Sequence, residues 1–171
     1  MRLLLHMCCG PCSTYPVQEL QNEGIDIQGY FYNPNIHPME EHKRRRENVE
    51  KFSSVKNIPV IYDDDFRQTE WEGMKDKGDA RCIGCYSLRL EKAAELAAQK
   101  GFDAFTTTLL VSPYQKHDLI IELGEKYAAQ YGTQFLYRDF RPGFRQGQQM
   151  AKDMGLYRQK YCGCILSLPT K

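Results

Sequence analysis

Long apolar stretches are missing from this chain of 171 residues. No segment approaches the roughly 20 apolar residues that a membrane-spanning helix needs. Met1 leads within one residue into the short apolar run 3–5, so no secretory leader is indicated. An excess of either charge is also missing: the formal net charge is +1, and a neutral total neither indicates nor excludes a nucleic-acid partner. We therefore expect a cytoplasmic protein.

Nucleotide-binding loops are absent as well. The sequence contains neither a Walker motif nor GxGxxG, and it lacks the Ser-Gly-Gly-x-Asp-Ser loop that ATP pyrophosphatases carry after their first strand. Internal repeats, low-complexity stretches and dividing linkers are also lacking. With 42% hydrophobic and 26% charged residues, the composition is that of a globular protein, and we expect one domain spanning 1–171.

Apolar runs of strand length alternate with stretches of helical periodicity. Strands are expected at 3–5, 26–32, 58–62, 103–109 and 133–137, and helices at 14–22, 39–56, 69–75, 86–100, 115–130 and 147–154. This alternation predicts an α/β fold with an open, mostly parallel five-stranded sheet and helices on both faces. A short C-terminal appendage follows from residue 138.

Cysteine is abundant, and its placement is uneven. The seven residues form three clusters: Cys8/Cys9/Cys12, Cys82/Cys85 and Cys162/Cys164. Stable disulfides are not expected in a cytosolic protein. Neighbouring cysteines are also held about 3.8 Å apart at Cα, below the roughly 4.4–6.8 Å of a relaxed disulfide. Metal binding or thiol redox chemistry is the expected use of such clusters.

Two of these clusters are expected at helix starts. The first follows strand 3–5, at the sheet edge where α/β proteins bind ligands. Cys82 and Cys85 directly precede a predicted helix, whose N-terminus would stabilise thiolates. Two thiols from each cluster make four, the number that holds an iron–sulfur cluster or a tetrahedral zinc. Iron–sulfur is favoured because the thiols gather at the functional edge, although zinc or a metal-free CxxC pair remains an alternative.

The remaining cysteines suggest separate roles. Cys162 and Cys164 flank a glycine and suit an easily reduced disulfide that relays electrons, or else two further ligands. Cys12 is left as a free thiol or as a ligand to a second metal.

Basic residues occur in two places that suit RNA. Residues 42–46 are either a solvated helix face or a phosphate contact. Near the C-terminus, arginines and a lysine alternate with aromatic residues, a pattern typical of single-stranded RNA binding, although the same aromatics would also pack the appendage onto the sheet. This second set is Arg138, Arg141, Arg145, Arg158 and Lys160 with Phe140, Phe144, Tyr157 and Tyr161.

Several segments together resemble a known family, the QueH type of epoxyqueuosine reductase. They are His-Met-Cys-Cys-Gly-Pro-Cys-Ser at 6–13, Tyr-Phe-Tyr-Asn-Pro-Asn-Ile at 30–36, Arg-Cys-Ile-Gly-Cys-Tyr-Ser-Leu-Arg-Leu at 81–90, Thr-Thr-Thr-Leu-Leu-Val-Ser-Pro-Tyr at 106–114 and Tyr-Cys-Gly-Cys at 161–164. The resemblance implies a fold similar to the adenine-nucleotide α-hydrolase (HUP) group. It also implies removal of the epoxide oxygen from epoxyqueuosine at the tRNA wobble position, without cobalamin.

The resemblance also implies roles for the cysteines. Cys8, Cys9, Cys82 and Cys85 would hold a [4Fe-4S] cluster, and Cys162 with Cys164 would be the redox-active pair. Some relatives carry an acidic residue where Cys12 stands and bind an additional mononuclear iron, which Cys12 would ligate here. The partners implied are the tRNA anticodon loop and an electron donor that the sequence does not identify.

Epoxide deoxygenation consumes two electrons and two protons and leaves an alkene and water. His6, Tyr114 and His117 are the candidate proton donors, although a histidine at a strand end is more often packed and hydrogen-bonded. Two other functions compete with this assignment: a zinc-binding RNA-recognition module, and a metal-free thiol-disulfide oxidoreductase.

Overall fold

The computed structural model describes residues 1–73 and 79–161. Within these ranges, four parallel strands form one sheet of order β3-β2-β1-β4. The strands are β1 (Arg2–His6), β2 (Asp26–Tyr32), β3 (Val60–Asp63) and β4 (Ala104–Thr107). The helices are α1 (Gly10–Asn22), α2 (Met39–Lys56), α3 (Gln68–Glu72), α4 (Asp79–Gln99), α5 (His117–Tyr131) and α6 (Phe144–Asp153), with 3₁₀ helices η1 (Thr108–Val111) and η2 (Arg141–Gly143). The predicted open α/β fold is confirmed.

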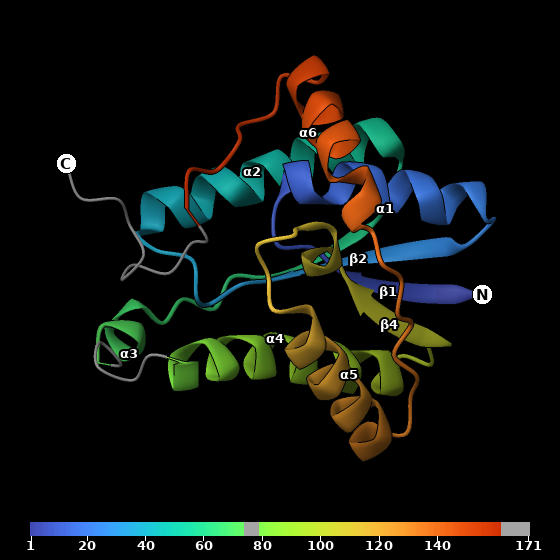
Figure 1. Cartoon of the computed structure of the whole chain (residues 1–171), viewed down its shortest axis with the longest axis vertical. Helices are drawn as coiled ribbons and strands as arrows, with labels where there is room; N and C mark the ends of the chain where they lie inside the picture. Colours follow the sequence, from blue (N-terminus) through green and yellow to red (C-terminus); the bar gives the residue numbers. More distant parts are fainter. Residues whose placement is uncertain (74–78, 162–171) are drawn as a thin grey trace.

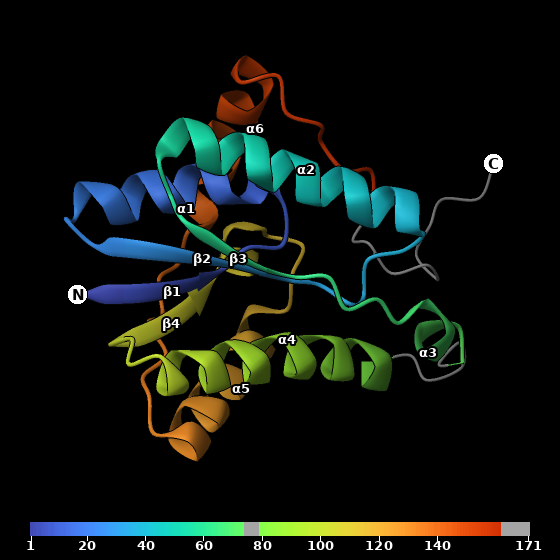
Figure 2. The ribbon, with the colours of Figure 1, turned by 180° about the vertical axis from the view of Figure 1, so that it is seen from behind.

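Helices cover both faces of the sheet. Figures 1 and 2 show α1, α2 and α6 on one face and α4 with α5 on the other, with α3 beyond the end of the sheet. Leu3, Leu4 and Leu5 of β1 are fully buried, as expected of a central strand in a parallel sheet covered on both sides. In the neighbouring strand β2, a Cβ at Gly29 would lie 2.7 Å from the Met7 sulfur, so a glycine is needed there.

The predicted strand count of five was wrong, because the described residues form a four-stranded sheet. Residues 133–137 join the sheet only through an isolated parallel bridge between Phe105 and Phe135. Two backbone hydrogen bonds form this bridge, from the Phe105 N–H to the Gln134 carbonyl and from the Leu136 N–H to the Phe105 carbonyl. Phe135 is also held by its ring, whose centroid lies 5.3 Å from that of Phe105.

Two helix starts also differ from prediction, and both differences concern cysteines. Helix α1 begins at Gly10 rather than near Thr14, so Cys9 is its N-cap and Cys12 lies in its first turn. Helix α4 begins at Asp79, so Cys82 and Cys85 lie within its first two turns rather than before it. A spacing of three residues places both cysteines on one side of that helix. The helix ends predicted at Gly24 and Gly101 agree with their φ angles of 76° and 72°.

None of the described helices is both long and apolar enough to cross a membrane.

Candidate functional site

The first cysteine cluster lies where the order of the sheet reverses. The chain runs from β1 outward through β2 to β3 and then returns to β4 on the other side of β1. Ligands of open α/β folds bind at such a switch point, beyond the carboxyl ends of the strands. Cys8 follows β1 and Thr108 follows β4, and the Cys8 backbone N–H donates a hydrogen bond to Thr108 Oγ1 at 3.2 Å. The cluster therefore occupies the ligand-binding edge that the sequence predicted.

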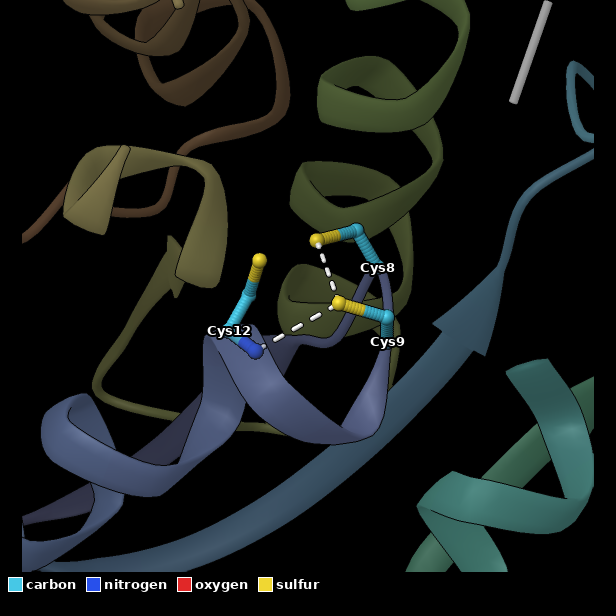
Figure 3. A group of neighbouring side chains, drawn as sticks. All are labelled: Cys8, Cys9 and Cys12. Atoms are coloured by element: carbon cyan, nitrogen blue, oxygen red, sulfur yellow. Dashed lines mark hydrogen bonds between the residues drawn. The ribbon is translucent and has the colours of Figure 1, made fainter. Parts of the chain in front are cut away.

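Three buried sulfur atoms gather over the first turn of α1 (Figure 3). The Sγ atoms of Cys8, Cys9 and Cys12 all lie within 4.8 Å of one another. Cys9 Sγ lies 3.8 Å from Cys8 Sγ and accepts a hydrogen bond from the Cys12 backbone N–H at 3.4 Å. Three thiols at this spacing can ligate one metal ion or one metal cluster.

Protons are unevenly distributed over these thiols. Hydrogen bonds from the Cys12 and Cys9 thiols lower the pKa of the Cys8 thiol well below its usual value, and the Thr108 hydroxyl, 3.3 Å from Cys8 Sγ, acts in the same direction. Burial raises the pKa of Cys9, and the hydrogen bond to Cys8 raises that of Cys12. The cluster thus favours a single thiolate, and metal binding would release the remaining protons.

Gln159 reaches the same sulfur atoms from a distant part of the chain. Its side-chain amide donates hydrogen bonds to Cys9 Sγ at 3.1 Å and to Cys12 Sγ at 3.5 Å. The sequence did not single out Gln159, whereas Thr108 belongs to the segment 106–114 that carries the family resemblance. A glutamine in a polar segment gives no signal in the sequence, because its partner lies 150 positions away.

The second cysteine cluster faces the same cavity from α4. Cys8, Cys12, Cys82 and Cys85 all line it, although the sulfurs of Cys82 and Cys85 are not among those within 4.8 Å of one another. Cys85 Sγ accepts a hydrogen bond at 3.1 Å from Arg89, one turn further along α4. Of the four predicted ligands, the structure therefore places Cys8, Cys82 and Cys85 around one cavity, while Cys9 is grouped with Cys8 and does not line it.

This cavity has a volume of about 530 Å³ and is cationic. Five basic residues line it, and no aspartate or glutamate is found among the described residues of its wall. The basic residues are Arg45, Arg81, Arg89, Lys116 and Lys160, and the aromatic ones are Trp71, Tyr86, Tyr114, Phe144 and Tyr161. A cationic wall suits bound thiolates, and it equally suits the phosphates of a nucleic acid.

A buried ion pair holds one wall of the cavity in place. Arg45 Nε lies 2.7 Å from Glu41 Oε2, and the two side chains are 3% and 7% exposed. Arg45 Nη2 donates a hydrogen bond to the Tyr161 carbonyl at 2.6 Å, and the Tyr157 hydroxyl donates one to Glu41 Oε1 at 2.9 Å. The solvated-face interpretation of residues 42–46 is therefore wrong for Arg45, which fastens the segment 157–161 onto α2.

The three proton-donor candidates occupy different positions. His6 is fully buried, and its Nε2 donates toward the Tyr32 carbonyl at 3.1 Å while Nδ1 lies 2.9 Å from the Thr107 hydroxyl. Burial lowers the pKa of His6 to about 4, so it is neutral and packed, as strand-end histidines usually are. His117 is buried and bonded to the Ser112 carbonyl. Of the three, only Tyr114 lines the cavity.

The other predicted site residues are only partly described. Cys162 and Cys164 lie outside the described residues. In the basic and aromatic segment, Arg141 pairs with Asp139 at 2.8 Å, and the buried Phe140 packs edge-on against Tyr15. Phe144, Lys160 and Tyr161 line the cavity. The segment therefore contributes both to packing and to the wall of the site.

Comparison with known proteins gives the family. The family model for "Epoxyqueuosine reductase QueH" matches residues 3–170. The chain is 36% identical over 167 residues to the epoxyqueuosine reductase QueH of Dehalococcoides mccartyi, covering 97% of this chain and 92% of that protein. It is 35% identical over 176 residues to the Thermotoga maritima protein of the same name, covering 97% and 90%.

A solved structure supports the fold at lower identity. It is described as a predicted subunit of tRNA methyltransferase from Methanocaldococcus jannaschii, with a TM-score of 0.54, 12% identity, and coverage of 88% of this chain and 76% of that one. At this identity the likeness concerns the fold alone. The family match extends over nearly the whole chain and includes every cysteine cluster, so this protein belongs to the epoxyqueuosine reductase QueH family.

Proposed function

We propose that this protein is an oxidoreductase that reduces epoxyqueuosine to queuosine at the wobble position of tRNA. The observation that carries the proposal is the group of three buried thiols at the switch point, opening on a cationic cavity that Cys82 and Cys85 also line. The names of the relatives supply the reaction. The substrate is an anionic polymer, in agreement with the charge of the cavity.

We assign a [4Fe-4S] cluster to Cys8, Cys9, Cys82 and Cys85. Three of these thiols, Cys8, Cys82 and Cys85, line one cavity, and Cys9 Sγ lies 3.8 Å from Cys8 Sγ. Tetrathiolate coordination is usual for such clusters, so the donor set fits. When bound, the cluster supplies electrons one at a time. Cys12 lies beside the ligands and is assigned to an additional iron. Arg89 donates to Cys85 Sγ and stabilises negative charge on that thiolate.

The reaction consumes two electrons and two protons in total, and the chain has a pair of thiols that can store both. The described segment ends at Tyr161 in the cavity wall, and Cys162 is the next residue. We assign Cys162 and Cys164 to a redox-active pair, whose oxidation to a disulfide releases two electrons and two protons. Arg45 and Glu41 hold the segment that leads to this pair against α2. The epoxide loses its oxygen as water, and an alkene remains.

The test of the reaction is mass spectrometry of tRNA nucleosides from cells that lack this protein and contain no other reductase for the step. Epoxyqueuosine is expected to accumulate, and restoring the gene should restore queuosine. Unchanged queuosine in the deletion strain would show that the assignment is wrong. Restoration by a Cys8→Ala variant would show that the thiol site is not required.

The test of the ligand set is a panel of single Cys→Ala variants purified anaerobically. Cys8→Ala and Cys82→Ala should lose the brown colour and the visible absorbance that dithionite bleaches, while Cys12→Ala should keep them. The reverse result, with colour lost in Cys12→Ala and kept in Cys82→Ala, would assign the cluster to Cys8, Cys9 and Cys12. A colourless protein with stoichiometric zinc would favour the zinc-binding module, and a colourless metal-free one the thiol-disulfide oxidoreductase.

A further inference from the structure

Tyr114 is the most exposed large hydrophobic side chain in the described part of the protein, at 84%. It lies between η1 and α5, and its backbone N–H donates to Ser112 Oγ at 3.2 Å, which fixes the loop locally. Single exposed hydrophobic residues are common and by themselves indicate nothing. The position of Tyr114 is what distinguishes it, because this ring lines the thiol cavity.

A second aromatic residue supports the ring from one side. The centroids of Tyr114 and Phe144, the first residue of α6, lie 5.9 Å apart, with the ring planes at 83°. An edge-to-face pair of this kind holds a ring in a defined orientation. Because Tyr114 is 84% exposed despite this contact, most of its surface remains open to a ligand.

The charge around the ring limits what such a ligand can be. Lys116 lies two residues from Tyr114 in the same wall, and Lys160 lines the cavity as well. Arg81 and Arg89 also line the cavity, and no described residue of the wall carries a carboxylate. An exposed aromatic face beside cations is the arrangement that binds single-stranded nucleic acid, where a base stacks on the ring and phosphates meet the cations.

We propose that Tyr114 is a base-stacking residue that binds an anticodon-loop nucleotide next to the modified one, while the modified nucleotide enters the cavity toward the thiols. This rests on the proposed function for the identity of the RNA. It assigns Tyr114 to binding through its ring face rather than to proton donation through its hydroxyl. An enzyme that acts on a base must bring it out of the stack, and a ring that replaces the lost stacking lowers the cost of doing so.

The test is the affinity for a fluorescein-labelled, unmodified RNA hairpin with the sequence of the anticodon arm, measured by anisotropy. Tyr114→Ala should weaken binding roughly 5- to 100-fold, the loss expected for one stacked base. Tyr114→Phe should bind like the wild type, because a phenyl ring keeps the stacking face. The matched control is Tyr137→Ala, since Tyr137 is 36% exposed and does not line the cavity.

The salt dependence of hairpin binding distinguishes a stacking contact from a contact between a cation and a phosphate. Lys160→Ala should reduce the slope of log affinity against log salt by about one, whereas Tyr114→Ala should leave the slope unchanged. Circular dichroism and thermal unfolding of Tyr114→Ala should match the wild type, because the side chain is exposed. The proposal is overturned if Tyr114→Ala binds the hairpin normally, or if Tyr114→Phe loses as much affinity as Tyr114→Ala.

The two proposals fail separately. RNA binding that depends on Tyr114 without accumulation of epoxyqueuosine in the deletion strain contradicts the reaction and leaves the stacking role standing. Accumulation of epoxyqueuosine together with normal hairpin binding by Tyr114→Ala contradicts the stacking role alone. If Tyr114→Ala binds RNA normally but reacts slowly with a protein reductant and at the normal rate with dithionite, the ring contacts a protein partner and our proposal is wrong.

Discussion

The Gln159 side-chain amide donates a hydrogen bond to Cys9 Sγ at 3.1 Å. Gln159 belongs to the segment that Arg45 fastens to α2, so this contact connects the C-terminal part of the cavity wall to the first turn of α1. Hydrogen bonds to ligand sulfurs stabilise their negative charge and are one of the means by which proteins set the reduction potential of an iron–sulfur cluster.

Gln159→Leu should therefore lower the reduction potential of the reconstituted protein, because the reduced, more negative state loses a hydrogen-bond donor. A redox titration followed by visible absorbance measures the change. Gln149→Leu is the control, since Gln149 is exposed on α6 and donates a hydrogen bond to Asp153. Equal potentials in the wild type and Gln159→Leu would show that the amide does not act on the cluster.

Arg45→Met should destabilise the protein by about 3–5 kcal/mol, because Glu41 would be left as a buried charge without its partner. Urea unfolding of the metal-free protein measures the effect. Arg46→Met is the matched control in the same helix. Arg46 pairs with Glu50 at 3.6 Å and with Asp64 at 3.1 Å on the surface, and its loss should cost about 0–1 kcal/mol.

A double variant, Glu41→Gln with Arg45→Met, completes the thermodynamic cycle for the pair. It should be less destabilised than the sum of the two single variants, since neither charge is left alone. Strict additivity would show that the ion pair contributes nothing to fastening the segment 157–161.

Two helical glycines should respond in opposite directions to the same substitution. A Cβ at Gly124 of α5 would lie 2.7 Å from the Phe135 ring, whereas a Cβ at Gly84 of α4 would meet nothing within 4 Å. Gly124→Ala should destabilise the protein by about 1–3 kcal/mol through overpacking. Gly84→Ala should stabilise it by up to about 1 kcal/mol, since alanine favours the helix. Thermal unfolding of the metal-free variants distinguishes the two, and a stabilised Gly124→Ala would contradict the close packing of α5 on residue 135.

Lowering the pH should reduce the free energy of unfolding, because the histidines are buried in the folded protein. Burial lowers the pKa of all four of them, most clearly that of His6, which falls to about 4. The unfolded chain takes up these protons near pH 6.5, while the folded protein does so only at lower pH. The unfolded state therefore binds more protons between these values, and the free energy of unfolding should fall as the pH drops from about 6.5 to 5.

His42→Phe should make that pH dependence shallower. The ring of His42 packs edge-on against Phe31 and Phe66, and its buried Nε2 has no hydrogen-bond partner in the described structure. Phenylalanine keeps the aromatic packing and removes the proton-binding group. Urea unfolding of the metal-free protein at several pH values measures the slope, and an unchanged slope would show that His42 does not contribute.

The sequence was sufficient to predict the fold class and the sheet edge that carries the site. The periodicity of strands and helices is a local property of the sequence, and each cysteine cluster lies within a few residues. These features could therefore be recognised without knowing any contact between distant residues. Helix α1 was placed too late because Cys9 caps it with a sulfur, whereas the side chains that usually signal a helix start carry oxygen.

The supporting residues could not be predicted because their roles depend on distant partners. In the sequence, Arg45 is one arginine of a basic run. Only the structure shows that it donates a hydrogen bond to the Tyr161 carbonyl. Residues 133–137 carry a strand-like pattern, but only Phe135 pairs with β4, through one isolated bridge to Phe105. The roles of Cys162 and Cys164 remain predictions, since they lie beyond the described chain.

The separation between Cys9 and Gln159 also sets an order of events during synthesis. The ribosome completes the thiol turn long before it makes the segment that closes over it. Until then, the sulfurs of Cys9 and Cys12 lack the hydrogen bonds that Gln159 donates in the finished protein. If the proposed cluster is inserted before residue 159 is made, its sulfurs gain these hydrogen bonds only after the cluster has been assembled.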